Sequence, residues 1–163
     1  MALQRTFVMI KPDGVERGLV GECLSRFERC GLKIIGMKML WVDNAFAQCH
    51  YTEDIAKRRG EKVHKNLLKF ITEGPVVAMA LEGVDAIAVV RKMAGDTEPA
   101  KALPGTIRGD YAHISILHAD ERNKAIPNII HASSDEQDAA TELTLWFTDK
   151  ELHSYHHSHE KFI

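Results

Sequence analysis

The stretch NIIHASSD, residues 128–135, places a histidine between two isoleucines and a run of small polar residues. The chain contains nine histidines, and a histidine in an apolar setting is most often a packed or hydrogen-bonded core residue. A chemical role for His131 therefore depends on which other groups the chain brings to it.

Three cations lie where the backbone is expected to turn: Lys11 at a strand end, Arg91 shortly before Gly95, and Arg108 in the stretch TIRGD. Each alone is most often a solvated surface charge. Together, arginine forks and a lysine point charge suit the oxygens of a triphosphate, so the alternative is a phosphate clamp. No GxxxxGK[ST] or GxGxxG motif is present, so any nucleotide site must be built from side chains.

Composition sets the broad class of the protein. With 163 residues the chain fits one domain, residues 1–163, and 45% hydrophobic with 27% charged residues is typical of a globular protein. The chain has 21 basic and 23 acidic side chains, and because there is no basic surplus, a nucleic-acid partner is not expected. Three cysteines, no signal-like start and no long apolar run predict a cytoplasmic protein without membrane contact.

The first half of the chain shows clear periodic elements. Residues 6–11 read as a strand closed by PDG, and residues 19–30 as an amphipathic helix that stops at Gly31. Residues 32–42 predict a second strand with a possible bulge at Gly36, and Asp43 is expected to cap a helix that runs to about Tyr51.

The second half is less regular. We expect a charged loop over residues 53–65, a short helix ended by Gly74, a buried strand over 76–83 and a helix from Asp85 to Gly95. A long loop over 96–110, a strand over 111–117, a polar connection over 118–127 and a helix over 136–146 follow. This order predicts an α+β, ferredoxin-like αβ sandwich, in which helices cover a four-stranded antiparallel sheet (βαββαβ).

Six ordered blocks carry a resemblance to a known family: TFVMIKPDGVERGLVGE, GPVVAMALEG, RKMAGDTEPA, PGTIRGD, NIIHASSD and ELTLWF. Along nearly its whole length the sequence resembles the nucleoside diphosphate kinases. The resemblance implies an enzyme that moves the γ-phosphoryl group of a nucleoside triphosphate such as ATP to a nucleoside diphosphate in a ping-pong cycle. Such an enzyme maintains nucleoside triphosphate pools.

By that resemblance His131 is the nucleophile, phosphorylated on its pros nitrogen. A neutral imidazole attacks without first losing a proton, and phosphohistidine keeps a transfer potential close to that of a phosphoanhydride. Ser133 and Glu142 match the two family residues that support the histidine. Glu142 orients the imidazole through the nitrogen that does not attack.

The resemblance also assigns the groups that hold the nucleotide. Lys11 matches the lysine that reaches the phosphate and the ribose hydroxyl, Tyr51 lies near the transferred group, and Asn128 contacts the ribose 3′-hydroxyl. The phosphate-binding residues are Arg91, Thr97 and Arg108. The nucleotide phosphates are expected to carry Mg²⁺, so no metal cage made of protein ligands is expected.

Three stretches depart from the family pattern. The usual phenyl ring that stacks on the base is missing, so Val63 or His64 must replace it, in a stretch about four residues longer than usual. The segment between Arg108 and Asn128 is about ten residues longer than in the family pattern, and it includes the connection HADERNKAIP, residues 118–127. Ala132 stands where the family has glycine, which is tolerable if its φ is negative.

Other readings remain open. The chain could be a catalytically silent, nucleotide-binding regulatory member of the family, although its intact site residues argue against this. His153, His156 and His157 would share one face of a helical tail and could hold a transition metal, or could simply be solvated. The resemblance further implies a homo-oligomer, expected to be a hexamer, with the loop that contains PGTIRGD packed against neighbouring subunits.

Overall fold

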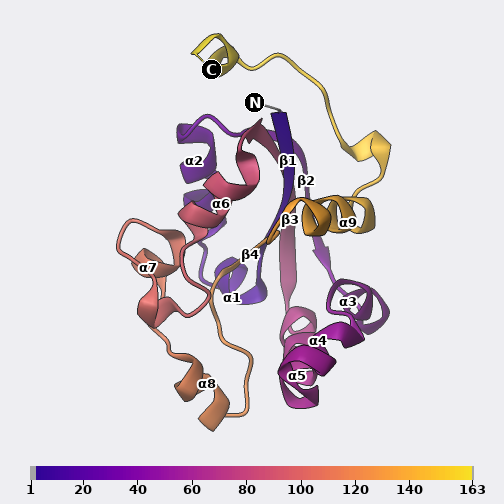
Figure 1. Cartoon of the computed structure of the whole chain (residues 1–163), viewed down its shortest axis with the longest axis vertical. Helices are drawn as coiled ribbons and strands as arrows, with labels where there is room; N and C mark the ends of the chain where they lie inside the picture. Colours follow the sequence, from indigo (N-terminus) through magenta and orange to yellow (C-terminus); the bar gives the residue numbers. More distant parts are fainter. Residues whose placement is uncertain (1–2, 163) are drawn as a thin grey trace.

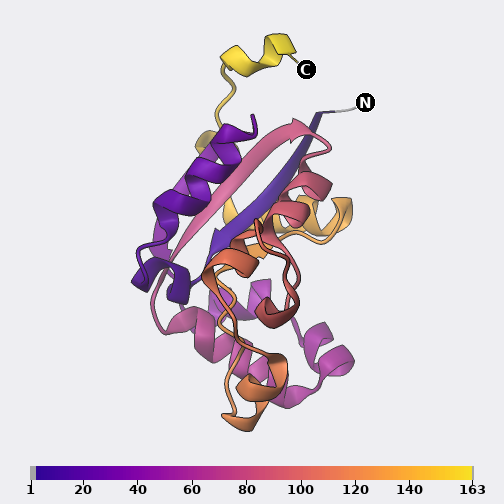
Figure 2. The same cartoon turned by 90° about the vertical axis from the view of Figure 1, so that its left-hand side faces the viewer.

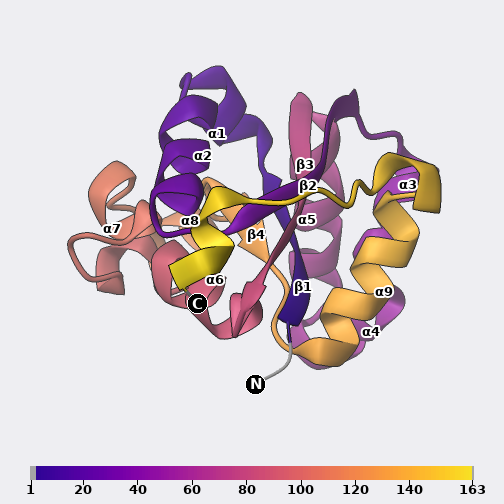
Figure 3. The ribbon, with the colours of Figure 1, turned by 90° about the horizontal axis from the view of Figure 1, so that it is seen from above.

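The computed structural model describes residues 3–162 and contains a four-stranded antiparallel sheet in the order β2-β3-β1-β4 (Figure 1). The strands are β1 (Leu3–Ile10), β2 (Lys33–Trp41), β3 (Pro75–Val84) and β4 (Ile130–Ala132). Helices cover both faces of the sheet, as the view from above shows (Figure 3). The predicted ferredoxin-like α+β fold is confirmed.

Side chains of the central strand β1 alternate between two hydrophobic cores, as the two-residue period of a strand requires. Val8 and Ile10 pack with α2 (Val20–Arg29) and α6 (Ala86–Ala94). Phe7 and Met9 face the other core, which α3 (Asn44–His50), α5 (Glu61–Thr72) and α9 (Glu136–Trp146) cover. The central strand β1 is therefore buried on both faces of the sheet.

Several local predictions are confirmed. The Asp43 carboxylate caps α3 by accepting a hydrogen bond from the Phe46 amide at 2.8 Å. The register of β2 against β3 shifts between Ile34 and Gly36, which is the expected bulge. The last long helix, α9, spans residues 136–146 as predicted.

The prediction of a loop over residues 53–65 was wrong. Two helices occupy this region, α4 (Glu53–Arg59) and α5, joined at Gly60 with φ of 95°. Helix α4 has no buried residue, so it lacks the apolar periodicity that reveals most helices. Its acidic first turn and basic last turn instead complement the helix dipole.

The prediction of a strand over residues 111–117 was also wrong. The long loop contains a short 3₁₀ helix, η1 (Pro99–Lys101), and then α7 (Ile107–Tyr111), and α8 (Ile116–Glu121) begins the inserted segment (Figure 2). The fourth strand is β4, which carries His131 and pairs with β1 through three residues. A strand of three residues is too short to show a readable alternation.

The turn PDG begins a short helix, α1 (Pro12–Glu16), with proline in its first turn. At the other end, η2 (Asp149–Glu151) and η3 (Ser158–Phe162) flank an irregular segment that bonds to β2, with the His153 amide 2.7 Å from the Ile35 carbonyl. The helical tail expected to align three histidines is thus absent from residues 152–157. No helix within residues 3–162 is long and apolar enough to cross a membrane.

Candidate active site

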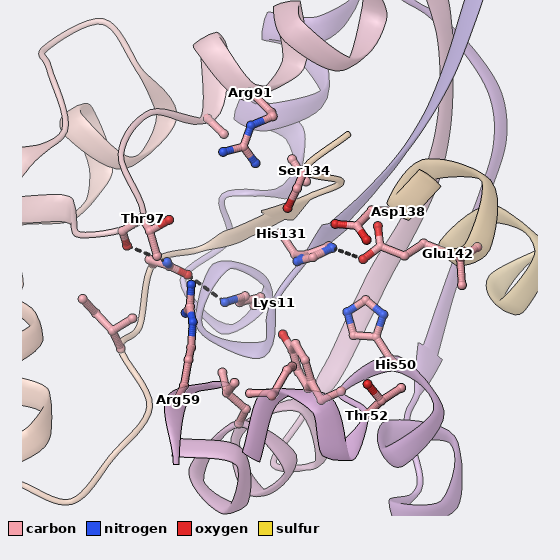
Figure 4. Close-up of a pocket in the computed structure, with 18 of the residues that line it drawn as sticks. Lys11, His50, Thr52, Arg59, Arg91, Thr97, His131, Ser134, Asp138 and Glu142 are labelled. Carbon is pink, nitrogen blue, oxygen red and sulfur yellow. Dashed lines mark hydrogen bonds and ion pairs between the residues drawn. The ribbon is translucent and has the colours of Figure 1, made fainter. Parts of the chain in front are cut away.

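A cavity of about 420 Å³ opens between β4, α9, the α3–α4 region and the loop after α6 (Figure 4). Most of the predicted site residues line this cavity although they come from distant parts of the sequence: Lys11, Tyr51, Arg91, Thr97, Arg108, Asn128, His131 and Glu142. Ser133 lies behind it, fully buried. The fold therefore brings these predicted residues together at one cavity.

His131 lies on β4 opposite Met9 of β1, with 21% of its side chain exposed. Its Nε2 is 2.6 Å from Glu142 Oε1 (Figure 4). The Ser133 hydroxyl donates to Glu142 Oε2 at 2.6 Å. A carboxylate partner keeps the proton on Nε2, so the lone pair of the imidazole lies on Nδ1. The ring is thus held in an orientation that leaves Nδ1 available.

A chain of hydrogen bonds connects Lys11, Asn128 and Thr97. Lys11 Nζ donates to Asn128 Oδ1 at 2.8 Å, and Asn128 Nδ2 donates to the Thr97 carbonyl at 2.7 Å. Burial, and secondarily the nearby Arg108 charge, lower the pKa of Lys11 to about 8. The ammonium group is therefore a poorly solvated cation, which an anionic phosphate would stabilise.

The two arginines differ in their surroundings. Arg108 is buried and donates to three backbone carbonyls, those of Gly95, Asn128 and Ile130, at 2.8, 3.2 and 2.7 Å. Burial, followed by repulsion from Arg91, lowers its pKa to about 10. Arg91 is exposed, and its side chain makes no hydrogen bond or ion pair within residues 3–162. Arg91 is therefore free to bind an anion, whereas Arg108 also organises the backbone.

Tyr51 is buried beside the cavity, and burial raises the pKa of its hydroxyl above the usual value. Ala132 lies in β4 and is not among the residues with positive φ. Its methyl group in place of glycine is therefore tolerated by the backbone.

The sequence did not reveal His50, which lies beside His131 with ring centroids 4.8 Å apart and nearly perpendicular planes. Its Nδ1 accepts a hydrogen bond from the Trp146 indole at 3.1 Å, while its Nε2 is buried without a partner. Burial, and then the charges of His131 and Lys11, hold the pKa of His50 well below its usual value, so the ring is neutral. No sequence signal distinguishes this histidine from the others.

Ligand atoms of His50, His131 and Glu142 lie within 4.8 Å of one another, the one group of this kind within residues 3–162. Since the Trp146 indole donates to His50 Nδ1, the proton of the neutral ring lies on Nε2, which then has no lone pair for a metal. The cluster is better suited to hydrogen bonding than to metal coordination.

A family model described as nucleoside diphosphate kinase matches residues 4–152 of the chain. The chain belongs to the nucleoside diphosphate kinase family. A nucleoside diphosphate kinase of Borreliella burgdorferi is 49% identical over 95% of this chain and 93% of its own length. That of Pyrococcus horikoshii is 50% identical over 93% of this chain and 90% of its own length.

Solved structures agree with this assignment. A nucleoside diphosphate kinase from Borrelia burgdorferi, a transition state mimic with bound vanadate and ADP, has a TM-score of 0.95 and 48% identity, and covers 97% of this chain and 95% of that one. A halophilic nucleoside diphosphate kinase from Halobacterium salinarum in complex with CDP has a TM-score of 0.84 and 40% identity, with 99% and 98% covered. The chain is thus a nucleoside diphosphate kinase, a phosphotransferase that acts on nucleotides.

Two residues assigned to the base site of this nucleoside diphosphate kinase do not reach the cavity. The His64 ring is buried, and its Nε2 is 2.6 Å from the Tyr51 carbonyl, where it ties α5 to the end of α3. Val63 is its neighbour on α5 and is likewise outside the lining. The large aliphatic side chains that do line the cavity are Ile55, Leu67, Ile126 and Leu145.

Proposed function

We propose that this nucleoside diphosphate kinase transfers the phosphoryl group through His131, which is phosphorylated on Nδ1. The observation that carries the proposal is the pairing of Nε2 with Glu142, because it leaves Nδ1 as the nucleophilic atom beside the cations of the cavity. The Ser133 hydroxyl fixes the other carboxylate oxygen, so the imidazole keeps its tautomer and its direction.

In the first half-reaction, the Nδ1 lone pair forms a bond to the γ-phosphorus while the bond from that phosphorus to the β–γ bridging oxygen breaks. The nucleoside diphosphate leaves, and the proton on Nε2 stays shared with Glu142, which stabilises the positive charge that develops on the ring. In the second half-reaction, a β-phosphate oxygen of another nucleoside diphosphate forms a bond to this phosphorus while the bond from phosphorus to Nδ1 breaks. The products are the nucleoside triphosphate and the neutral imidazole. We assign stabilisation of the phosphoryl oxygens to Lys11, Arg91 and the Tyr51 hydroxyl, since all three residues line the cavity.

We assign the ribose to Asn128 and Lys11, and the remaining phosphates to Thr97, Arg91 and Arg108. Mg²⁺, which prefers oxygen ligands, would be carried by the nucleotide phosphates. Two imidazoles and a single carboxylate, the cluster found beside the nucleophile, are a poor donor set for it. When bound, Mg²⁺ would neutralise phosphate charge that the protein cations do not reach.

A steady-state assay tests this proposal against a catalytically silent, regulatory role. Initial rates measured with varied ATP at several fixed concentrations of a second nucleoside diphosphate should give parallel double-reciprocal lines, since a phosphoenzyme separates the two substrates. Intersecting lines would contradict a phosphohistidine intermediate, and absence of turnover would favour the silent role. Comparison with the protein carrying Glu142→Gln, expected to be roughly ten- to hundredfold slower, controls for a contaminating kinase.

We propose that the nucleotide base lies against Leu67 and Ile126, in place of the missing phenyl ring. Leu67→Ala should then raise KM for the diphosphates of A, G, C and U about three- to tenfold with little change in kcat, because uniform binding is lost. Steady-state assays of the four diphosphates measure this, with Val63→Ala on the same helix as a control outside the cavity. Equal effects of the two substitutions, or no effect of Leu67→Ala, would refute this base site.

We further propose a homo-oligomer, a hexamer, with β2 at one of its interfaces. Met37, Met39 and Trp41 alternate along this edge strand and are 55%, 61% and 66% exposed. Such a stripe on a strand edge is suited to pairing with a second copy. In the long loop, Leu103 is 73% exposed and offers a second apolar contact.

Replacement of Met39 by lysine should lower the oligomer mass, because each two-fold contact would bury two new charges. Light scattering coupled to size exclusion at micromolar protein measures this. Leu117→Lys on α8, at a residue 75% exposed and away from β2, is the matched control. A monomeric wild type, or dissociation by Leu117→Lys alone, would contradict the proposal.

The cytoplasmic location suggested by the cysteines stays a prediction.

A further inference from the structure

The backbone just before the nucleophile is strained. Ile129 has φ of 71°, in the left-handed region that β-branched residues rarely adopt. The Ile130 amide donates to the Asn128 carbonyl at 2.7 Å, so residues 128–130 form a γ-turn of the uncommon, positive-φ kind. Such a conformation persists only where the surroundings over-determine it.

The turn separates two residues of the active site. Asn128, which contacts Lys11 and Thr97, begins the turn, and His131 follows it in β4. The sharp change of direction at Ile129 lets both side chains line the same cavity although only three positions separate them. The strain is therefore located where it decides the relative placement of the ribose site and the nucleophile.

Several contacts hold this turn from the side of α1. Asp13 Oδ2 accepts a hydrogen bond from the Ile129 amide at 2.9 Å, and the Ile129 carbonyl accepts from the Lys11 amide at 2.8 Å. A Cβ at Gly14 would lie 3.0 Å from the Ile129 carbonyl oxygen, so the helix start packs directly on the turn. On the other side, Arg108 donates to the carbonyls of Asn128 and Ile130.

Among these contacts, the carboxylate of Asp13 is the only side-chain group within residues 3–162 that pairs with the Ile129 amide. Ile129 is fully buried, so water is a poor substitute for Asp13 as the acceptor of this amide. Asp13 does not line the cavity, and its Oδ1 is buried without a hydrogen bond. A half-buried carboxylate with one fully buried, unpartnered oxygen is costly, which argues that its bond to the Ile129 amide serves a purpose.

We propose that Asp13 is a positioning residue for phosphoryl transfer: its Oδ2 anchors the strained γ-turn at Ile129 and thereby sets the direction of His131. The inference rests on the proposed function of His131. It predicts that loss of this acceptor lets the turn relax, which misdirects Nδ1 more than it disturbs the cations that bind the nucleotide. Chemistry should therefore suffer more than binding.

The test uses rapid-quench measurement of phosphoenzyme formation from labelled ATP together with calorimetric binding of ADP. Asp13→Ala should slow phosphoenzyme formation at least about tenfold while the Kd for ADP changes less than about threefold. Asp13→Asn keeps an amide oxygen as acceptor and should stay within about threefold of wild type in both measurements. Circular dichroism confirms that each variant is folded.

A second background separates positioning from general structural damage. Ile129→Gly removes the penalty for positive φ, so the turn no longer needs an anchor, and adding Asp13→Ala to it should slow phosphoenzyme formation less than about threefold further. An equal loss in both backgrounds, or an Asp13→Asn variant as slow as Asp13→Ala, would overturn the proposal. If wild type formed no phosphohistidine, the proposed function itself would fail, an outcome separate from these ratios.

Discussion

His131→Ala is expected to abolish phosphoenzyme formation and to lower kcat by about four orders of magnitude or more, because loss of a covalent nucleophile removes the pathway itself. Binding of ADP should stay within a few-fold of wild type, since the proposed phosphate and ribose contacts come from other residues that line the cavity, Lys11, Arg91 and Asn128 among them. Coupled assays and calorimetry measure the two quantities on the same preparation.

The control for this substitution is Glu142→Gln, which leaves the imidazole in place but weakens its hydrogen bond. This variant should still form the phosphoenzyme, roughly ten- to hundredfold more slowly. Turnover retained by His131→Ala would refute the assignment of the nucleophile. An unchanged rate in Glu142→Gln would show that another group, such as the neighbouring His50, fixes the ring.

Arg108→Met is expected to lower the free energy of unfolding by about 3 kcal/mol or more, because it removes the side-chain donor to three carbonyls, those of Gly95, Asn128 and Ile130. Arg91→Met should change the free energy of unfolding by less than about 0.5 kcal/mol, since the Arg91 side chain is exposed and makes no hydrogen bond within residues 3–162. Both substitutions should weaken ATP binding. The two arginines thus share a charge but differ in structural role.

Urea unfolding followed by circular dichroism, at one fixed protomer concentration, measures these stabilities. The concentration must be constant because an oligomer is stabilised by mass action. Equal midpoints for the two variants would contradict the division of roles between Arg91 and Arg108. Arg108→Lys is a useful intermediate: it keeps the charge but cannot reach three carbonyls at once, so most of the loss should remain.

The sequence predicted best those features whose signal is local and repeated. The buried strand β3, the capped helix α3 and the helix α9 have long apolar patterns or an identifiable cap, and the structure confirms each. The failures have physical causes. Helix α4 buries nothing and so shows no apolar face, and β4 is only three residues long, held in place by pairing with β1.

The site was predictable as a set of residues, but the arrangement of its supports was not. The resemblance grouped Lys11, Asn128 and His131, and all three line one cavity. It assigned the base site to Val63 or His64 because the alignment there depends on an insertion, whereas the fold turns His64 toward the Tyr51 carbonyl. Hydrogen bonds between distant segments, such as that of Asp13 with Ile129, have no sequence pattern at all.

The most direct test of the central claim is to incubate wild-type protein with ATP labelled on its γ-phosphate and Mg²⁺, in the absence of a nucleoside diphosphate. The account predicts about one labelled phosphate per chain, stable in base and labile in acid, located on His131 by peptide mapping and transferred to added diphosphate. No labelled protein, or an acid-stable label on a hydroxyl side chain such as Ser133, would contradict the account.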